Sequence, residues 1–155
     1  MEIEGIENLE ERDENERKAI EFVINEEIKE NRKIKISSIR EHYDILSIGS
    51  NPNDIRYIEV KGLKHFKNIM LSEIEFKTAL KYKDRYHLYI VYDRESNNPK
   101  IVKIQNPIKK LKFKIMRVAI GGIVKRKEKV YTLTLRSFLK LKEKIESDKN
   151  DIDRL

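Results

Sequence analysis

The chain contains no cysteine and no tryptophan among its 155 residues, and it has no long apolar run. Without cysteine, disulfides and thiolate metal sites are excluded. No stretch approaches the ~20 apolar residues of a membrane span, and the acidic N-terminus lacks the pattern of a signal peptide. We therefore expect a soluble, cytoplasmic protein without a membrane partner. A chain of this length buries roughly 70% of its unfolded surface, enough for one domain with a core.

The net charge of +7 is distributed unevenly. Residues 1–16 contain eight acids and one arginine, whereas residues 61–140 contain 21 Lys and Arg against six Asp and Glu. A basic region of this size favours a polyanion through counterion release. The alternative is a lysine-rich, solvated surface, but confinement of the excess to one part of the chain favours nucleic acid. Residues 1–13 are expected to form a flexible acidic segment or a helical extension.

Apolar spacing predicts a first helix from Glu14 to about Glu30. Glu27 falls in the middle of its apolar stripe, while Glu26 points away. A carboxylate in that position is either an edge residue whose charged end reaches solvent or an acid directed inward.

Two apolar runs at about 42–50 and 55–61 flank four turn formers and predict a β-hairpin. With the turn centred on Pro52-Asn53, position 44 faces position 61. Because alternate side chains of a strand share a face, Asp44, Glu59 and Lys61 are expected to project together. Ionised groups in buried strands are costly unless they are paired or used, so this trio is the leading candidate site.

The rest of the sequence predicts one mixed α/β domain over residues 14–147, followed by a polar tail, 148–155. The predicted order is α-β-β-α-β-β, with an extra C-terminal β-hairpin and helix. Ser72 and Glu75 have the spacing of a capping box that opens the second helix. The later expected elements are strands at 86–92, 100–105, 112–120 and 130–135, and a helix at 136–147.

The pattern of Asp44, a fourteen-residue gap and Glu59-Val60-Lys61 resembles the core of the PD-(D/E)xK nuclease superfamily, the restriction-endonuclease-like fold. There a helix precedes a strand carrying Asp, and the hairpin partner carries (Asp/Glu)-x-Lys. Tyr43 stands where the superfamily's name has proline. Glu27 falls where many members carry an acid facing the site, so the resemblance implies that Glu27 points inward.

A closer likeness covers roughly residues 19–107 and resembles the NO VEIN C-terminal domain. That domain is often appended to helicases and ATPases, so the resemblance implies such a partner, and nuclease domains of this kind often act as homodimers. The likeness rests on the runs His42–Ser47, Ile58–Gly62, Leu71–Glu75 and Tyr86–Tyr92.

The expected cofactor is Mg²⁺ or Mn²⁺, because these cations take oxygen ligands. Asp44 and Glu59 would supply carboxylate oxygens, and the resemblance adds the Val60 carbonyl. Lys61 would orient or deprotonate the attacking water, or neutralise the scissile phosphate, and Glu27 would assist through a second metal or a metal-bound water. The alternative is a buried ion-pair network in which Lys61 offsets the two acids.

These residues together predict a metal-dependent nuclease-fold domain acting on nucleic acid, with DNA favoured over RNA. The other possibility is a catalytically silent binding or docking module of the same fold. Backbone phosphates are expected to contact Lys64, Lys67, Lys77, Lys81, Lys125, Arg126, Lys127 and Lys129.

Overall fold

The computed structural model describes residues 3–63, 68–94, 98–120 and 126–133, together with Lys140 and Glu143. The predicted helix 136–147 and the polar tail therefore lie outside the described residues, those two positions excepted. The elements are, in chain order, β1 (Ile3–Glu4), η1 (Ile6–Glu11), α1 (Glu14–Lys29), β2 (Lys33–Ile36), β3 (Ile45–Ile48), β4 (Ile55–Gly62), β5 (Ile69–Ser72), α2 (Glu73–Tyr82), η2 (Lys83–Arg85), β6 (Tyr86–Tyr92), β7 (Lys100–Gln105), α3 (Pro107–Lys110), β8 (Lys114–Ile120) and β9 (Arg126–Leu133).

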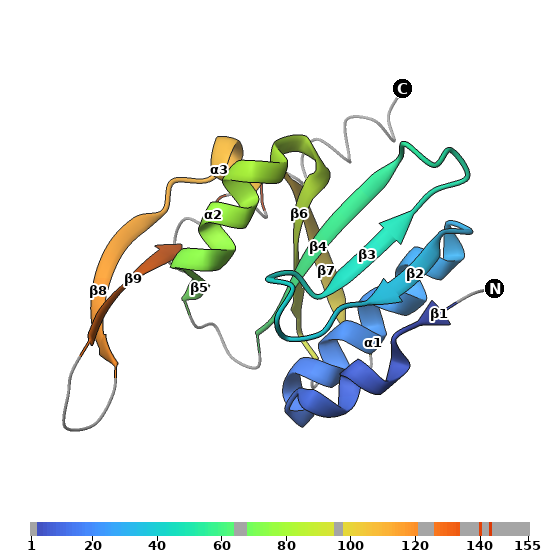
Figure 1. The fold of residues 1–155 in the computed structure, drawn as a ribbon, viewed down its shortest axis with the longest axis horizontal. Helices are drawn as coiled ribbons and strands as arrows, with labels where there is room; N and C mark the ends of the chain where they lie inside the picture. Colours follow the sequence, from blue (N-terminus) through green and yellow to red (C-terminus); the bar gives the residue numbers. More distant parts are fainter. Residues whose placement is uncertain are drawn as a thin grey trace.

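Two sheets organise the described chain (Figure 1). The larger has six strands in the order β1-β2-β3-β4-β6-β7 and is mixed, because β4 pairs antiparallel with β3 and parallel with β6. The smaller has the order β5-β9-β8, and its β8–β9 ribbon extends away from the rest of the molecule. The predicted α/β class is confirmed. None of the described helices combines the length and the apolarity that crossing a bilayer requires.

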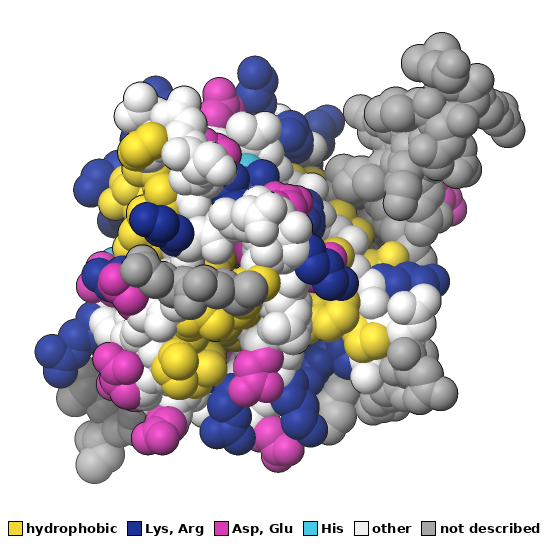
Figure 2. All heavy atoms as spheres, turned by 90° about the vertical axis from the view of Figure 1, so that its right-hand side faces the viewer, with side chains coloured by type: hydrophobic (Ala, Val, Ile, Leu, Met, Phe, Trp, Pro, Cys, Tyr) yellow, Lys and Arg dark blue, Asp and Glu magenta, His cyan; other side chains and the backbone are white. Residues whose placement is uncertain are grey.

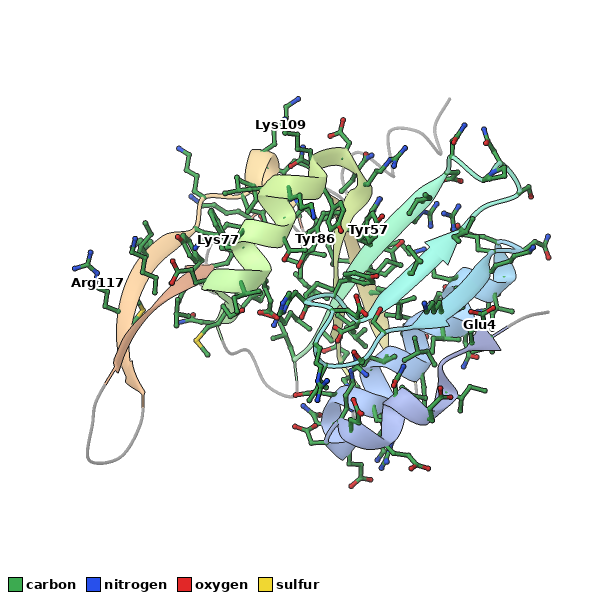
Figure 3. The ribbon with its side chains drawn as sticks, viewed as in Figure 1. Glu4, Tyr57, Lys77, Tyr86, Lys109 and Arg117 are labelled. Carbon is green, nitrogen blue, oxygen red and sulfur yellow. The ribbon has the colours of Figure 1, made fainter. Side chains whose placement is uncertain are left out.

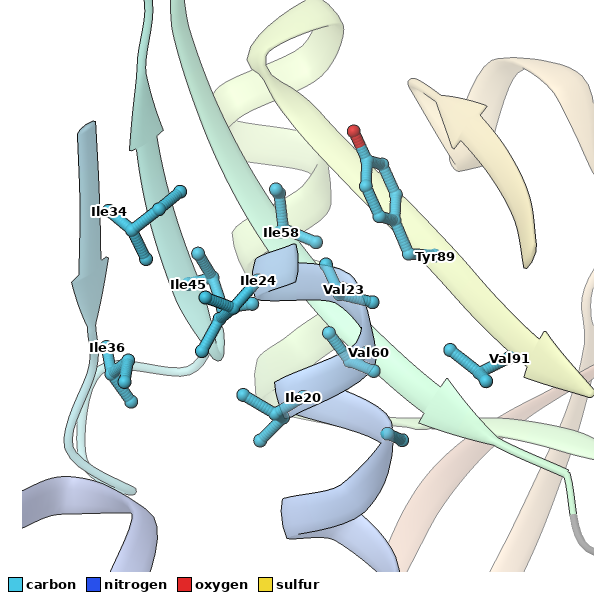
Figure 4. Packing of buried hydrophobic residues seen from close by; sticks show 11 residues of the cluster. Ile20, Val23, Ile24, Ile34, Ile36, Ile45, Ile58, Val60, Tyr89 and Val91 are labelled. Atoms are coloured by element: carbon cyan, nitrogen blue, oxygen red, sulfur yellow. The ribbon is translucent and has the colours of Figure 1, made fainter. Parts of the chain in front are cut away.

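α1 packs on one face of the large sheet through the predicted apolar stripe. Asp13 caps the helix by accepting a hydrogen bond from the Glu16 amide at 2.8 Å. Figure 4 shows the stripe meeting the sheet's aliphatic side chains. Each fully buried aliphatic side chain contributes about 1.5–3 kcal/mol, so this cluster holds α1 in place. Its members are Ala19, Ile20, Val23, Ile24, Ile34, Ile36, Ile45, Ile58, Val60, Tyr89 and Val91.

A second core lies on the opposite face of β6. Leu88, Ile90 and Tyr92 belong to this core, while the alternate residues Tyr89 and Val91 face α1. Burial on both faces explains why β6 is almost continuously apolar. On this side the predicted capping box is confirmed, with Ser72 and Glu75 bonding each other's backbone, and it starts α2.

The N-terminal segment differs from the expected flexible lead-in. Residues 3–11 form β1, which pairs with β2, and the short helix η1. Gly5 has a φ of 78°, and a Cβ there would collide with the Ile36 carbonyl, so only glycine fits this turn. Asn8 then donates to the same carbonyl at 2.9 Å. The acidic composition gave no sign of this ordered segment, because the segment is held by backbone pairing and by a few apolar side chains.

Candidate active site

A pocket of about 590 Å³ opens between the start of α1, the segment before β3, β4 and the start of α2. It contains five carboxylates and two strong cations, so its lining carries an excess of acid. The charged lining residues are Arg12, Asp13, Glu16, Asp44, Glu59, Lys61 and Glu75.

The β3–β4 hairpin brings Asp44, Glu59 and Lys61 into this pocket. Ile58 and Val60 are buried against α1, so the alternate residues Glu59 and Lys61 project from the other face of β4. Asp44 lies just before β3, and its Oδ2 accepts a hydrogen bond from the Val60 amide at 2.8 Å. The predicted trio therefore lines one cavity, and Val60 lines it too.

The hairpin register differs from the predicted one by two residues. Ile48 pairs with Ile55 and Ile45 with Ile58, which sets Asp44 beside Glu59 rather than beside Lys61. The cause is the turn, because the Gly49 amide donates to the Asp54 carbonyl at 2.9 Å and closes the loop earlier than expected. A shift of two residues keeps every side chain on its predicted face, whereas a shift of one would have separated the trio.

Lys61 lies between two carboxylates. Its Nζ is 3.2 Å from Glu59 Oε1 and 3.1 Å from Glu75 Oε1. Burial by itself would lower the pKa of Lys61, but Glu59, Glu75 and Asp44 outweigh it and raise this pKa above its ordinary value. Lys61 is therefore a paired ammonium ion rather than a free amine.

The carboxylates of the pocket disfavour one another's charge. Burial, then the neighbouring Asp44 and Glu75, raise the pKa of Glu59 well above its ordinary value. Burial also raises the pKa of Asp44, against the opposing effects of the Val60 amide, Arg12 and Lys61. Two cations thus compensate the acids only in part, and a further positive charge would be stabilised here.

Arg12 is a member of the site that sequence reasoning missed. It is buried at the end of the N-terminal segment, and its Nη2 lies 3.3 Å from Asp44 Oδ1. Its Nη1 donates to the Asn8 carbonyl at 2.8 Å, which fixes the guanidinium. Arg12 is the only basic residue among eight acids in residues 1–16, and this isolated positive charge was the one feature of the sequence that could have indicated its role.

Glu16 and Glu75 also reach the pocket. Burial, then the charges of Asp13 and Asp44, raise the pKa of Glu16. Glu16 lies four residues before Ile20 of the buried stripe, so helical spacing could have placed it on the same face. Sequence reasoning gave Glu75 only its capping role, although its carboxylate bonds both the Ser72 amide and Lys61.

Glu27 is directed inward, but the structure does not bring it to the trio. Its carboxylate is fully buried and accepts hydrogen bonds from Ser47 at 2.7 Å and from Tyr89 at 2.8 Å. Arg56 Nη1 lies 3.0 Å from Glu27 Oε1, and Arg32 Nε lies 3.3 Å from its Oε2. Glu27 does not line the pocket. About three helical turns separate Glu27 from Glu16, which does line the pocket, so the structure does not bring Glu27 to the position that catalytic assistance would need.

The predicted phosphate contacts are only partly described. Lys77 and Lys81 lie on α2, where Lys77 pairs with Glu73 at 3.4 Å and Lys81 lies over the Tyr82 ring. Lys129 is exposed on β9. The backbone alone is described for Arg126 and Lys127, and Lys64, Lys67 and Lys125 lie outside the described residues.

Within the described ranges, no three His, Cys, Asp or Glu side chains form a ready metal-binding group. Tyr86 supplies a further observation, since its buried hydroxyl has no hydrogen-bond partner among the described residues. Burial, then Glu59, Glu75 and Asp44, raise the pKa of this tyrosine. A buried, unpaired hydroxyl near an acid cluster leaves a polar group unsatisfied beside the site.

The fold and the pocket define a mixed α/β domain with an acidic, lysine-containing cleft at the end of a β-hairpin. Residues 15–104 match the family described as Protein NO VEIN, C-terminal, and this match covers more than half of the chain. The chain therefore belongs to that family. Arg12 and the segment before it precede the matched residues. No curated protein matches the chain, and no solved structure does.

Proposed function

We propose that this chain is a metal-dependent nuclease-fold domain that hydrolyses phosphodiesters in nucleic acid, in DNA rather than RNA. The carrying observation is that Asp44, Glu59 and Lys61, from adjacent segments of one hairpin, line one pocket with an excess of carboxylate. The pattern of residues and its place on the hairpin support a PD-(D/E)xK type of site.

The donor set suits Mg²⁺ or Mn²⁺. Both cations take oxygen ligands, and Mg²⁺ usually keeps several waters, so two carboxylates and the Val60 carbonyl suffice without a third acid. Burial above all, and for Glu59 the nearby Asp44 as well, raises the pKa values of these two carboxyl groups, and a bound divalent cation would stabilise their charged forms. When bound, the metal would supply Lewis acidity and lower the pKa of a coordinated water.

The chain's own groups have separate tasks in this proposal. Lys61, held as an ammonium ion by Glu59 and Glu75, donates to a phosphate oxygen and offsets charge that develops there. This favours the phosphate-neutralising role over the water-deprotonating one. Arg12 and the Val60 amide each hold one oxygen of Asp44, so this carboxylate is oriented before substrate arrives.

Nucleic-acid binding draws support from the β8–β9 ribbon and the α3 segment before it. In Figure 3, Arg117 projects from the ribbon and Lys109 from α3. Arg117 and Lys129 are cross-strand partners, a pairing of like charges that is unfavourable unless an anion lies nearby. On the face in Figure 2, by contrast, acidic and basic side chains are interspersed. Among the described residues, no ion pair involves Lys109, Lys110, Lys112, Lys114, Arg117 or Lys129.

The test combines calorimetric Mn²⁺ titration with cleavage of assorted DNA and RNA substrates. Glu59→Gln should abolish Mn²⁺ binding and cleavage, because one carboxylate ligand is lost. Lys61→Ala should keep Mn²⁺ binding and lose about 10²-fold or more in rate. Glu21→Gln, on the exposed side of α1, is the matched control and should behave as wild type.

Equal cleavage by all four proteins would show that the activity belongs to another site or to a contaminant, and the proposal would fail. The second candidate is a silent binding module, favoured by the fact that Lys61 and Arg12 are already paired with acids. Salt-dependent DNA binding without Mn²⁺ binding or cleavage would establish that module instead.

A further inference from the structure

Three large hydrophobic side chains form part of the rim of the pocket, whose floor is charged. Ile39, Met70 and Ile74 have exposed fractions of 62%, 55% and 50%, and all three line the pocket. They come from the segment before β3, from β5 and from α2, so three separate elements place large hydrophobic side chains at one opening. Exposed apolar groups gathered around a cavity mark an interaction site.

The groups on the floor are recessed below this rim. Glu59 is only 5% exposed, and the side chains of Lys61 and Asp44 are 24% and 18% exposed. The volume of about 590 Å³ is typical of pockets that enclose one small molecule. A double helix is a stiff rod, whereas the groups on the floor are mostly buried. A single strand can bend one nucleotide into the pocket.

The chemistry of the rim fits the faces of unpaired bases. Both strong cations of the pocket are paired with acids, so phosphate attraction within it is weak until a metal binds. Tyr43 also lines the pocket, and it adds an aromatic surface to the aliphatic rim. Stacking of a base on an aromatic side chain is worth about 1–3 kcal/mol and tolerates any sequence.

We propose, on the basis of the function proposed above, that the substrate is an unpaired strand of nucleic acid. One nucleotide enters the pocket, and its base lies against Tyr43, Ile39, Met70 and Ile74 while its phosphate faces Lys61. Intact duplex binds outside the pocket, through backbone contacts alone. Single strands, frayed ends and flaps are therefore substrates, and blunt duplex is not.

The experiment measures binding by fluorescence anisotropy, with Ca²⁺ in place of Mg²⁺. The probes are a single strand, a blunt duplex and a duplex with an unpaired flap. The double variant Ile39→Ser with Met70→Ser removes the rim. The control Ile6→Ser removes an isoleucine that is 58% exposed on η1 and lies outside both the pocket lining and the β8–β9 ribbon.

The rim variant should lose about tenfold or more in affinity for the single strand and the flap, with duplex affinity unchanged. The control should match wild type. Should the rim double variant unfold, Ile74→Ser on the surface of α2 gives the same comparison. Wild-type preference for blunt duplex, or equal losses in rim and control variants, would overturn this inference. The Mn²⁺ titration of Glu59→Gln, which needs no nucleic acid, judges the proposed function separately.

Discussion

Two clusters of buried charge lie on opposite faces of the same sheet, and they differ in how completely their charges are matched. Around Glu27, one buried carboxylate meets two arginines and two hydroxyl donors, so its oxygens are satisfied. Near the surface, Glu30 and Asp54 complete the pairing of those arginines. This closed network stabilises the contact between α1 and the sheet, and Glu27 does not line the pocket.

The cluster around Glu59 is open. Its carboxylates outnumber its cations, they line a cavity, and burial and mutual repulsion raise the pKa values of Glu59, Asp44 and Glu16. Such an arrangement destabilises the folded protein until something positive binds. Inward direction of an acid therefore does not by itself identify a functional group. The balance of charge around the acid does.

The largest expected effect comes from breaking the closed network. Glu27→Gln removes the fully buried counter-charge that the buried Arg32 and the half-buried Arg56 share, so the free energy of unfolding should fall by about 3–5 kcal/mol. Urea denaturation measures this loss. Glu26→Gln, next in the chain and paired with Lys29 near the surface, should cost less than about 1 kcal/mol.

The same substitution in the open cluster should act in the opposite direction. Glu59→Gln removes one member of an over-acidic set, so stability in the absence of metal should be unchanged or increased. A loss of stability in Glu59→Gln as large as that in Glu27→Gln would show that both clusters are structural networks, and the distinction drawn between them would be lost.

Two tyrosines of β6 provide an intermediate test, one for each cluster. The Tyr89 hydroxyl donates to Glu27 at 2.8 Å, so Tyr89→Phe should cost about 1.5–3 kcal/mol, as for a hydrogen bond to a charged group. Tyr86, which pairs with Tyr57 on β4 (Figure 3), has a hydroxyl without a hydrogen-bond partner among the described residues. Tyr86→Phe should therefore cost nothing or stabilise by up to about 1 kcal/mol. Thermal unfolding measures both, and equal losses would contradict the comparison.

A smaller effect than those of Glu27→Gln and Tyr89→Phe is expected from pH, beside the closed network. Burial, then Arg56, Arg32 and Lys110, lower the pKa of His87 to about 4. The folded protein thus resists a proton that the unfolded chain accepts near pH 6.5. Stability should be intact above that pH and decline by about 1–2 kcal/mol towards pH 4, after allowance for solvent screening.

Denaturation midpoints across this range check the expectation for His87. In His87→Gln the decline between pH 6.5 and 4 should be smaller than in wild type, whereas His42→Gln, at an exposed position, should retain the wild-type slope. An unchanged slope in His87→Gln would assign the acid sensitivity to other groups.

Elements with strong local signals were predicted closely. β6 and β7 have the bounds that alternation and turn residues indicated, and the Ser72 capping box begins α2 where it was expected. β5 was missed because it is short and follows a basic stretch. It is a strand only through its pairing with β9, some sixty residues later in the chain.

For the candidate site, the sequence predicted on which face of a strand a side chain lies. It did not predict which part of a helix lies over the pocket. Alternation along β4 placed Glu59 and Lys61 on one face whatever the exact register. The stripe of α1 left Glu27 as either an edge residue or an inward acid, and the family resemblance implied the inward direction. Neither indicated which turn of the helix lies over the pocket. That choice depends on the packing of the whole helix on the sheet, which also brings Glu16 and Arg12 to Asp44.

Glu75 connects the pocket to the first turn of α2. Glu75 Oε1 accepts a hydrogen bond from the Ser72 amide at 2.9 Å and another from Lys61 Nζ at 3.1 Å. Any ligand that draws Lys61 away changes the strength of the helix cap, and by thermodynamic linkage any change in the cap alters affinity for that ligand. Amide hydrogen exchange at Ser72 should therefore change when a ligand occupies the pocket.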